Sequence, residues 1–493
     1  MPERAGYHFG PRESPGSLAG WRAGQVAWVA SGLGLAVACL RVLPVLPGSV
    51  AGLAVLALGV LGATLQLGGR TAEEWAPVAL RWLAGGLGAR RYVSRLVEAG
   101  EELTVPSGGR GGASRGAQVS LPPPFRGCRL LCPPAAPSAP RLGVVHDAAA
   151  RSYVAVLRVQ SRPAALAGSE ERRRRVAAWA GLLASLAAQG QPVHRLQWVE
   201  RCVPAGLARF RGAAPTAGVP VGSLASYARL LDDEEPTCWR HEVLVALAVR
   251  ARRSPRSGGA SGEAAHTDLL GSRVRDLQAE LERAGLASDG PLAAPALSSC
   301  IRQAFLGDAA LRDPAAEEPA GDPWPWPLAT ETTWSAYRTE STWHATYWIA
   351  QWPRLEVGPD FLAPLLLGPP ARRTVALTLQ PVTPARAARE AEQARTADLA
   401  DAELRRRSGF APSARRSRQA ESVARREGEL ADGHAQLRFS GYVGITASSP
   451  EELERACRAV EQSAALARIE LCRLYGEADA AFTFTLPLAR GLS

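Results

Sequence analysis

The chain of 493 residues contains no lysine and no asparagine, and its single methionine is Met1. A P-loop of the GxxxxGK[ST] type needs a lysine that reaches the nucleotide phosphates, and Schiff-base chemistry needs a lysine amine. The sequence therefore excludes both within this chain. Arginine supplies the basic side chains, and an abundance of Ala, Gly and Pro beside it indicates a GC-rich coding sequence.

Cysteine and histidine are also sparse. No second ligand pair with zinc-like spacing accompanies Cys128 and Cys132, and the seven histidines form no HExxH or related motif. His146 and Asp147 adjoin each other, but no GxSxG elbow accompanies them. We therefore expect buried, reduced thiols and a protein that is not an enzyme, with no metal site and no cofactor.

The charge balance points to an acidic partner. The formal net charge is +10, which suits an anionic lipid surface, a nucleic acid or an acidic protein face. A chain of this length is also too long for one compact core, so more than one structural unit is expected.

Charged residues are missing from two long stretches near the N-terminus, which are separated by Arg41. Each stretch approaches the roughly 20 apolar residues that span a bilayer, and Pro44 and Pro47 predict a tight turn between them. We therefore expect a cytoplasmic tail over residues 1–22 and a two-helix transmembrane hairpin over 23–69. A signal peptide and a pair of buried core helices are the alternatives, and the length and uniform apolarity of the two stretches disfavour both.

Small residues recur every fourth position in both stretches, a spacing that lets membrane helices approach closely. The expected packing residues are Ala30, Gly34, Ala38, Gly59 and Ala63. Arginines are more numerous before and after the pair than in its turn, so the positive-inside rule places both termini in the cytoplasm. The expected location is the cell membrane, crossed twice, with the lipid bilayer as the first partner.

Residues 70–104 begin with Thr71-Ala-Glu-Glu74, a capping-box pattern that opens an amphipathic helix. This juxtamembrane helix suits either the cytoplasmic membrane surface or the start of the soluble part. Residues 105–141 are rich in Gly, Ser and Pro and predict a linker.

The remainder alternates strand and helix patterns, which predicts a cytoplasmic α+β region with helices packed on a largely antiparallel sheet. We divide it into an α+β subdomain over 142–322 and a second over 323–493. The second begins with a Trp-rich segment whose aromatic density favours a core strand over a base-stacking surface. The segment Ala480–Leu488 predicts a final strand.

Within the second subdomain, the stretch from Pro384 to Asp432 alternates Arg and Glu and predicts a projecting pair of solvated helices. Such a pair suits contact with a partner. The candidate contact residues in and after it are Arg405, Arg406, Arg407, Phe410, Arg415, Arg416, Arg425, Arg426 and His434.

Three segments carry a resemblance to a known family: Arg405-Arg-Arg-Ser-Gly-Phe410, the run from Arg425 to His434, and Phe439-Ser-Gly-Tyr442. With them, most of the chain resembles an actinobacterial family of membrane proteins associated with conjugation-like, type IV secretion-related gene sets. That family looks like a PrgI-like transmembrane hairpin fused to the non-motor N-terminal domain of a TraC-like assembly ATPase. The resemblance implies a non-catalytic structural subunit, a homo-oligomer, that docks a separately encoded P-loop motor ATPase.

Two further functions remain open. A two-helix anchor before an α/β domain is also typical of type VII secretion membrane components. The net charge also suits a membrane-tethered nucleic-acid-binding module. A hydrolase whose catalytic residues come together only in the fold ranks last.

Overall fold

A computed structural model places most of the chain. The residues that it describes are 9, 23–64, 66–67, 70–85, 90–94, 121–133, 142–160, 168–207, 221–234, 238–251, 260–312, 324–368, 370–408 and 414–492.

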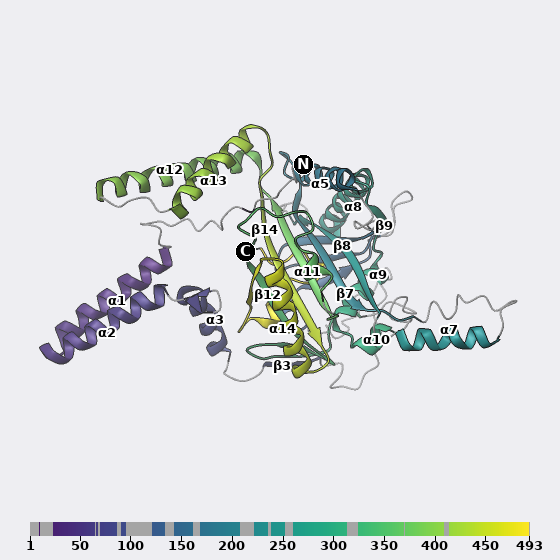
Figure 1. Ribbon diagram of the computed structural model, residues 1–493, viewed down its shortest axis with the longest axis horizontal. Helices are drawn as coiled ribbons and strands as arrows, with labels where there is room; N and C mark the ends of the chain where they lie inside the picture. Colours follow the sequence, from purple (N-terminus) through teal and green to yellow (C-terminus); the bar gives the residue numbers. More distant parts are fainter. Residues whose placement is uncertain are drawn as a thin grey trace.

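Two apolar helices open the described part of the chain, α1 (Ala23–Val42) and α2 (Val45–Thr64), and they run side by side away from the body of the molecule (Figure 1). Their connection is tighter than expected, because Pro47 and Gly48 lie inside the first turn of α2. Proline is tolerated there, since the amide that it lacks has no partner within the helix. The short strands β1 (Gln66–Leu67) and β2 (Arg70–Thr71) then reverse the chain into helix α3 (Ala72–Ala84).

The body is built on a 13-stranded antiparallel sheet. Along its main path the strand order is β3-β10-β11-β12-β14-β13-β7-β8-β6-β5-β4, and β15 and β9 pair with β12 and β6. The strands are β3 (Arg90–Val93), β4 (Cys128–Leu131), β5 (Val144–Asp147), β6 (Ser152–Gln160), β7 (Val193–Pro204), β8 (Trp239–Arg250), β9 (Ala287–Pro291), β10 (Ala329–Thr332), β11 (Tyr337–Thr339), β12 (Thr342–Gln351), β13 (Arg373–Pro381), β14 (Leu437–Ala447) and β15 (Glu470–Arg473).

The helices of the body and its extensions follow the same chain order. They are η1 (Pro123–Phe125), α5 (Ser169–Leu186), α7 (Val221–Glu234), α8 (Ala260–Arg283), α9 (Ala294–Arg302), η4 (Gln303–Phe305), α10 (Asp308–Arg312), α11 (Ala363–Leu366), α12 (Pro384–Ser408), α13 (Ala414–Ala431), α14 (Pro450–Leu466) and α15 (Ala478–Phe482).

The sheet contains the same topology twice. In the first half a strand, a helix, two strands, a helix and a strand give the spatial order β9-β6-β8-β7, and in the second half the order is β15-β12-β14-β13. Each set is a split βαβ unit of the βαββαβ type. A short hairpin partner precedes each unit, β5 in one and β11 in the other. The halves meet where β7 pairs with β13, so they form one continuous sheet.

Helices cover both faces of this sheet. On one face α5 and α8 pack over the first half and α14 over the second, around buried side chains such as Leu247 and Val443. On the other face lie α9, α15 and the segment after α15, around Val156, Phe305 and Leu486. Alternate residues of each central strand therefore face two different cores, as the two-residue period of a strand requires.

Three sequence expectations differ from the structure. The linker expected over 105–141 is interrupted by the fully buried Phe125 and by edge strand β4, which is too short to signal itself among Pro and Gly. Helix α8 begins at Ala260, in a Gly- and Ser-rich stretch that suggested a flexible segment. The final strand expected over Ala480–Leu488 is wrong. Helix α15 takes its first residues, and the rest crosses the sheet as irregular backbone.

The crossing segment is held by side chains of the sheet. Gln197 of β7 donates to the carbonyl of Phe484 at 2.8 Å and accepts from the amide of Ala489 at 2.8 Å, while Thr378 of β13 donates to the carbonyl of Arg490. The alternation of apolar and polar residues that suggested a strand therefore reflects burial against a sheet face. These bonds satisfy backbone groups that have no ladder partner.

Candidate functional site

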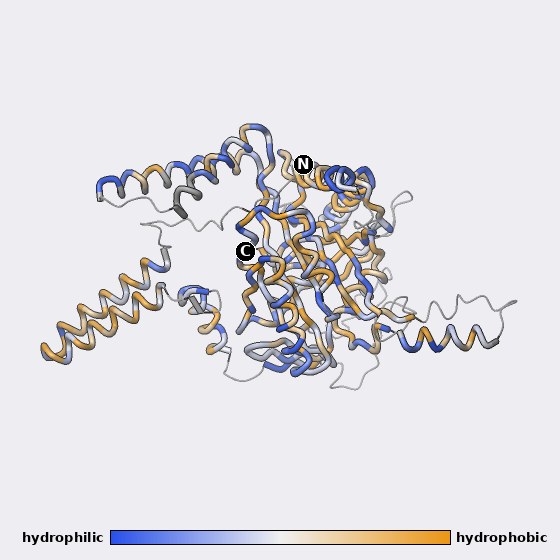
Figure 2. The backbone as a smooth tube through the Cα atoms, viewed as in Figure 1, coloured by the Kyte–Doolittle hydropathy of each residue, from blue (hydrophilic) through white to orange (hydrophobic). Residues whose placement is uncertain are grey.

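The outer surface of the α1–α2 hairpin is apolar. Figure 2 shows the pair as a largely hydrophobic extension of the molecule. Large apolar side chains are exposed on all its outward faces: Leu33, Leu35, Val37, Leu40, Val45, Leu46, Val50, Leu53, Leu58 and Leu61. Both helices are long and apolar enough to cross a membrane.

The interior of the hairpin contains small residues instead. A Cβ atom added to Gly32 would lie 3.3 Å from the Cα of Gly59, and one added to Gly52 would lie 3.2 Å from the carbonyl oxygen of Ala36. At the open end of the pair, Gln25 donates to the carbonyl of Ala63 at 2.8 Å. The hairpin is thus packed backbone against backbone, with its large side chains facing outward.

The predicted packing residues divide between two faces. Gly59 and Ala63 of α2 are buried in the contact. Ala30, Gly34 and Ala38 of α1 are exposed on the face turned away from α2, and a Cβ on Gly34 would meet nothing within 4 Å. The contact on α1 uses Gly32 and Ala36, another small pair with the same four-residue spacing but on a different face.

Helix α3 joins this hairpin to the body. As the capping box predicts, the Glu74 carboxylate accepts a hydrogen bond from the Thr71 backbone amide at 3.2 Å. The Trp75 ring stacks on Trp334 at 5.9 Å, and the Trp82 ring meets the edge of Trp334 at 5.5 Å. The helix is therefore docked on the sheet region and forms the start of the body.

Polar contacts reinforce this docking. Arg70 and Glu477 form an ion pair at 2.6 Å, which links the residue before α3 to the residue before α15. Arg90 donates to the carbonyls of Arg81 and Trp82 at the C-terminal end of α3, where a cation is favoured. Its guanidinium also lies 4.9 Å from the Trp82 ring centroid, a cation–π contact.

The charged helices α12 and α13 form an arm that projects from the body on the same side as the hairpin (Figure 1). At 1.5 Å per residue the 25 residues of α12 extend about 37 Å. Ala387, Ala391 and Val423 are buried in the arm, and Arg395 of α12 pairs with Glu427 of α13 at 2.7 Å.

The base of the arm is tied to β14 through Glu390. This carboxylate accepts from Arg386 at 2.8 Å and from Arg438 at 2.7 Å. Partial burial alone would raise the pKa of Glu390, but the hydrogen bonds from the two arginines lower it. Glu390 is therefore ionised at neutral pH and fixes the direction in which the arm leaves the sheet.

The candidate contact residues are spread along the arm. Arg406 and Arg407 are exposed, and both pair with Glu403, at 2.7 and 2.9 Å. Arg425 is exposed farther along α13, and His434 is exposed at the base. Phe410 and the side chains of Arg405, Arg415 and Arg416 lie outside the described residues.

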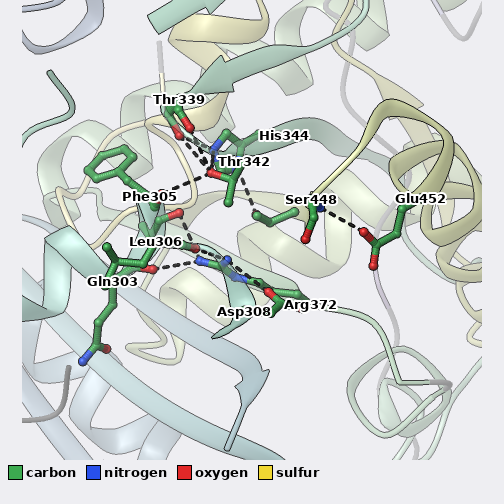
Figure 3. Close-up of polar contacts among 12 residues, drawn as sticks. Gln303, Phe305, Leu306, Asp308, Thr339, Thr342, His344, Arg372, Ser448 and Glu452 are labelled. Atoms are coloured by element: carbon green, nitrogen blue, oxygen red, sulfur yellow. Dashed lines mark hydrogen bonds and ion pairs between the residues drawn. The ribbon is translucent and has the colours of Figure 1, made fainter. Parts of the chain in front are cut away.

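A buried polar cluster lies where the two halves meet (Figure 3). Arg372 donates to the carbonyls of Gln303 at 2.8 Å and Leu306 at 2.5 Å, and Arg201 of β7 donates to the carbonyl of Cys300 at 2.8 Å. One arginine from each half thus binds the C-terminal carbonyls of α9 and η4, the end at which a helix favours cations.

Arg201 is balanced by a buried carboxylate. Glu242 of β8 pairs with Arg201, and Arg158 approaches the other carboxylate oxygen at 2.9 Å. Burial alone would raise the pKa of Glu242, but the two arginines hold it at about 2. A buried charge needs such partners, so this cluster is a structural requirement of the fold.

His344 of β12 sits nearby at 1 % exposure, between threonines (Figure 3). Its Nε2 lies 2.7 Å from the Thr339 hydroxyl and its Nδ1 lies 2.9 Å from the Thr446 hydroxyl. Burial, and then the positive charge of Arg372, hold the pKa of His344 well below its usual value. The ring is therefore neutral at physiological pH.

A thiol, an imidazole and a carboxylate also line up on β7 and β8. The Cys202 sulfur lies 3.9 Å from the Nε2 of His241, whose Nδ1 lies 2.6 Å from the Glu200 carboxylate. The hydrogen bonds with Cys202 and Glu200 raise the pKa of His241 to about 10. Cys202 is only 2 % exposed, so a substrate would have to displace core side chains to reach the sulfur.

Sequence reasoning missed this trio because Cys202 and His241 are far apart along the chain. The available signal was Glu200-x-Cys202, a spacing that puts both side chains on one face of a strand. Within the described ranges, no group of three or more His, Cys, Asp or Glu side chains is placed to hold a metal ion.

No protein-family model matches the chain, and no curated protein matches it.

The glycine contact predicts unequal effects of two matched substitutions in α1. Gly32→Leu should separate α1 and α2 by up to about 2 Å, the range over which side chains change the spacing of packed helices. Gly34→Leu should leave the spacing unchanged, because its added side chain has free space. Distances between spin labels at positions 33 and 58, in a variant without native cysteines, measure both. Equal widening in the two variants would contradict the observed packing face.

The buried His344 predicts a pH dependence of stability. Its folded-state pKa lies below the unfolded value, so the unfolded chain binds a proton that the folded chain does not, and the free energy of unfolding falls as pH drops below about 6.5. His344→Gln should reduce this slope by up to about 1.4 kcal/mol per pH unit. Denaturant unfolding between pH 7.5 and 5 measures it, with the exposed His434→Gln as the matched control. A slope unchanged in His344→Gln would refute the assignment.

Proposed function

We propose that this chain is a membrane-anchored, non-catalytic structural subunit of a conjugation-like type IV secretion machine, acting as a homo-oligomer that docks a separately encoded P-loop ATPase. One observation carries the anchoring: a hairpin with large apolar side chains outside and glycines inside is joined by a docked helix to an α+β body. The secretion assignment rests on the family resemblance of the arm and the strand after it.

Physical chemistry favours a bilayer around the hairpin. In water, every exposed apolar side chain costs free energy at about 25 cal/mol per Å². In lipid the same surface is solvated, and close packing of small residues becomes what holds the helices together. The exposed Leu33, Leu53 and Leu58 and the close approach of Gly32 to Gly59 fit the second situation.

Both ends of the hairpin approach the body. Before α1, the Phe9 ring lies 5.2 Å from the Trp352 ring and 5.3 Å from the Phe361 ring. After α2, helix α3 stacks on Trp334. A hairpin that crosses a membrane twice returns its ends to the side from which it entered, and the flanking arginines favour the cytoplasmic side.

The arm suits a protein partner better than a nucleic acid. Arg406 and Arg407 share the Glu403 carboxylate, and Arg395 pairs with Glu427, so their charges are already compensated within the arm. Phosphate binding would have to displace these carboxylates. A partner that carries both signs of charge, with an apolar contact at the exposed Leu399, fits the surface as it stands. We assign this role to the motor ATPase, which would supply the lysine-containing P-loop that this chain lacks.

Affinity purification of the full chain from native membranes tests the proposal. A P-loop ATPase should co-purify with the wild type and be lost on charge reversal of the arm by Arg406→Glu, Arg407→Glu and Arg425→Glu. A control with matched charge change, Arg273→Glu, Arg275→Glu and Arg283→Glu on helix α8 of the body, should retain it. Retention of the same ATPase by the arm variant would overturn the docking role, and a wild-type preparation without any P-loop ATPase would overturn the function.

A further inference from the structure

Helix α3 has two apolar faces, and the body covers one of them. Trp75, Val78 and Trp82 face the body, and the last two are less than 9 % exposed. On the opposite side Leu80 is 65 % exposed and Leu83 is 56 % exposed. Because residues three and four apart share a helix face, Ala76 and Ala84 extend this outer stripe. The outer face of α3 below means Ala76, Leu80, Leu83 and Ala84.

The position of α3 brings this outer face close to the end of the hairpin. The β1–β2 turn reverses the chain between the last residue of α2, Thr64, and the first of α3, Ala72. A Cβ added to Gly24 at the start of α1 would lie only 1.8 Å from the Glu73 carboxylate of α3. Helix α3 is therefore held against both open-end termini of the hairpin, within a few residues of the point where the hairpin would leave a bilayer.

Basic side chains border the same face. Arg81 is exposed between Leu80 and Leu83, and the side chain of Arg91 on β3 is 76 % exposed. A helix whose leucines point outward beside arginines matches the pattern of helices that lie in the headgroup region of a membrane. Each arginine near an anionic surface adds about 1 kcal/mol of attraction.

We propose that the outer face of α3 lies in the headgroup region of the leaflet from which the hairpin emerges, and so clamps the body directly onto an anionic membrane surface. This inference rests on the membrane anchoring proposed above. The inner face of α3 is packed on Trp334 while the outer face meets lipid, so the helix acts as a wedge between bilayer and sheet. The body would then hold a fixed orientation to the membrane, and the arm a fixed reach from it.

Photocrosslinking of the full chain in vesicles of phosphatidylcholine and phosphatidylglycerol tests the clamp. A benzophenone amino acid replaces Leu80 or Leu83 on the outer face, Leu58 on the hairpin, or Leu367 on the body, which is 71 % exposed. All four positions are exposed, so the fold tolerates the replacement, and the unfolding temperature of each variant verifies this. We expect lipid adducts at positions 58, 80 and 83 and only background at 367.

The outcomes separate the two proposals. Lipid adducts at 58, with protein adducts or none at 80 and 83, would overturn the clamp and leave the anchor standing. No lipid adduct at 58 would overturn both. The charge argument has its own readout: raising the phosphatidylglycerol fraction should increase the adduct yield at 80 but not at 58, and Arg81→Gln should weaken that increase. A yield at 80 that ignores lipid charge would refute the anionic preference.

Discussion

The stacking of Trp75 and Trp82 on Trp334 is the contact on which the arrangement of this molecule depends. It joins a helical pair with an apolar exterior to a sheet with an apolar interior. Without it, the hairpin and the body would be linked only through loops and could take any relative direction. With it, and with the Arg70–Glu477 ion pair beside it, a force on the body is transmitted to the hairpin through packed side chains.

The body owes its unity to a seam between two similar halves. Strands β7 and β13 pair across it, and Arg201 and Arg372 reach from the two halves to the end of the same helical segment. The repeat also explains where the extensions occur. Helix α7 is inserted between β7 and β8, and the arm is inserted between β13 and β14, which is the equivalent position of the second half. Because β7 and β13 run in opposite directions, the two insertions leave the sheet at opposite ends (Figure 1).

Local patterns predicted much of this fold. The apolar run Tyr153–Val159 gave a central strand, and Ser449 caps α14 by accepting from the Glu452 amide, as its sequence suggested. The packing face of α1 was not predictable, because Gly32 and Ala36 have the same spacing as Gly34 and Ala38. Only the partner helix selects between the two faces. Edge strand β4 and the crossing segment after α15 were missed for a related reason, since both depend on contacts with residues far away in the chain.

The candidate site was predictable as a set of segments rather than as a geometry. The charge pattern indicated the arm, but the internal pairing of its arginines with Glu403 and Glu427 appears only in the fold. The two-sided role of α3 was likewise visible as two alternatives, and the structure places the tryptophans against the body and the leucines outside.

The central claim is that the hairpin is inserted in a bilayer. Alkaline carbonate extraction of membranes from cells that express the full chain tests it most directly, because carbonate strips proteins held only by charge or by a partner. The account predicts that the chain stays in the membrane pellet and is released only by detergent. Release into the carbonate supernatant would contradict it.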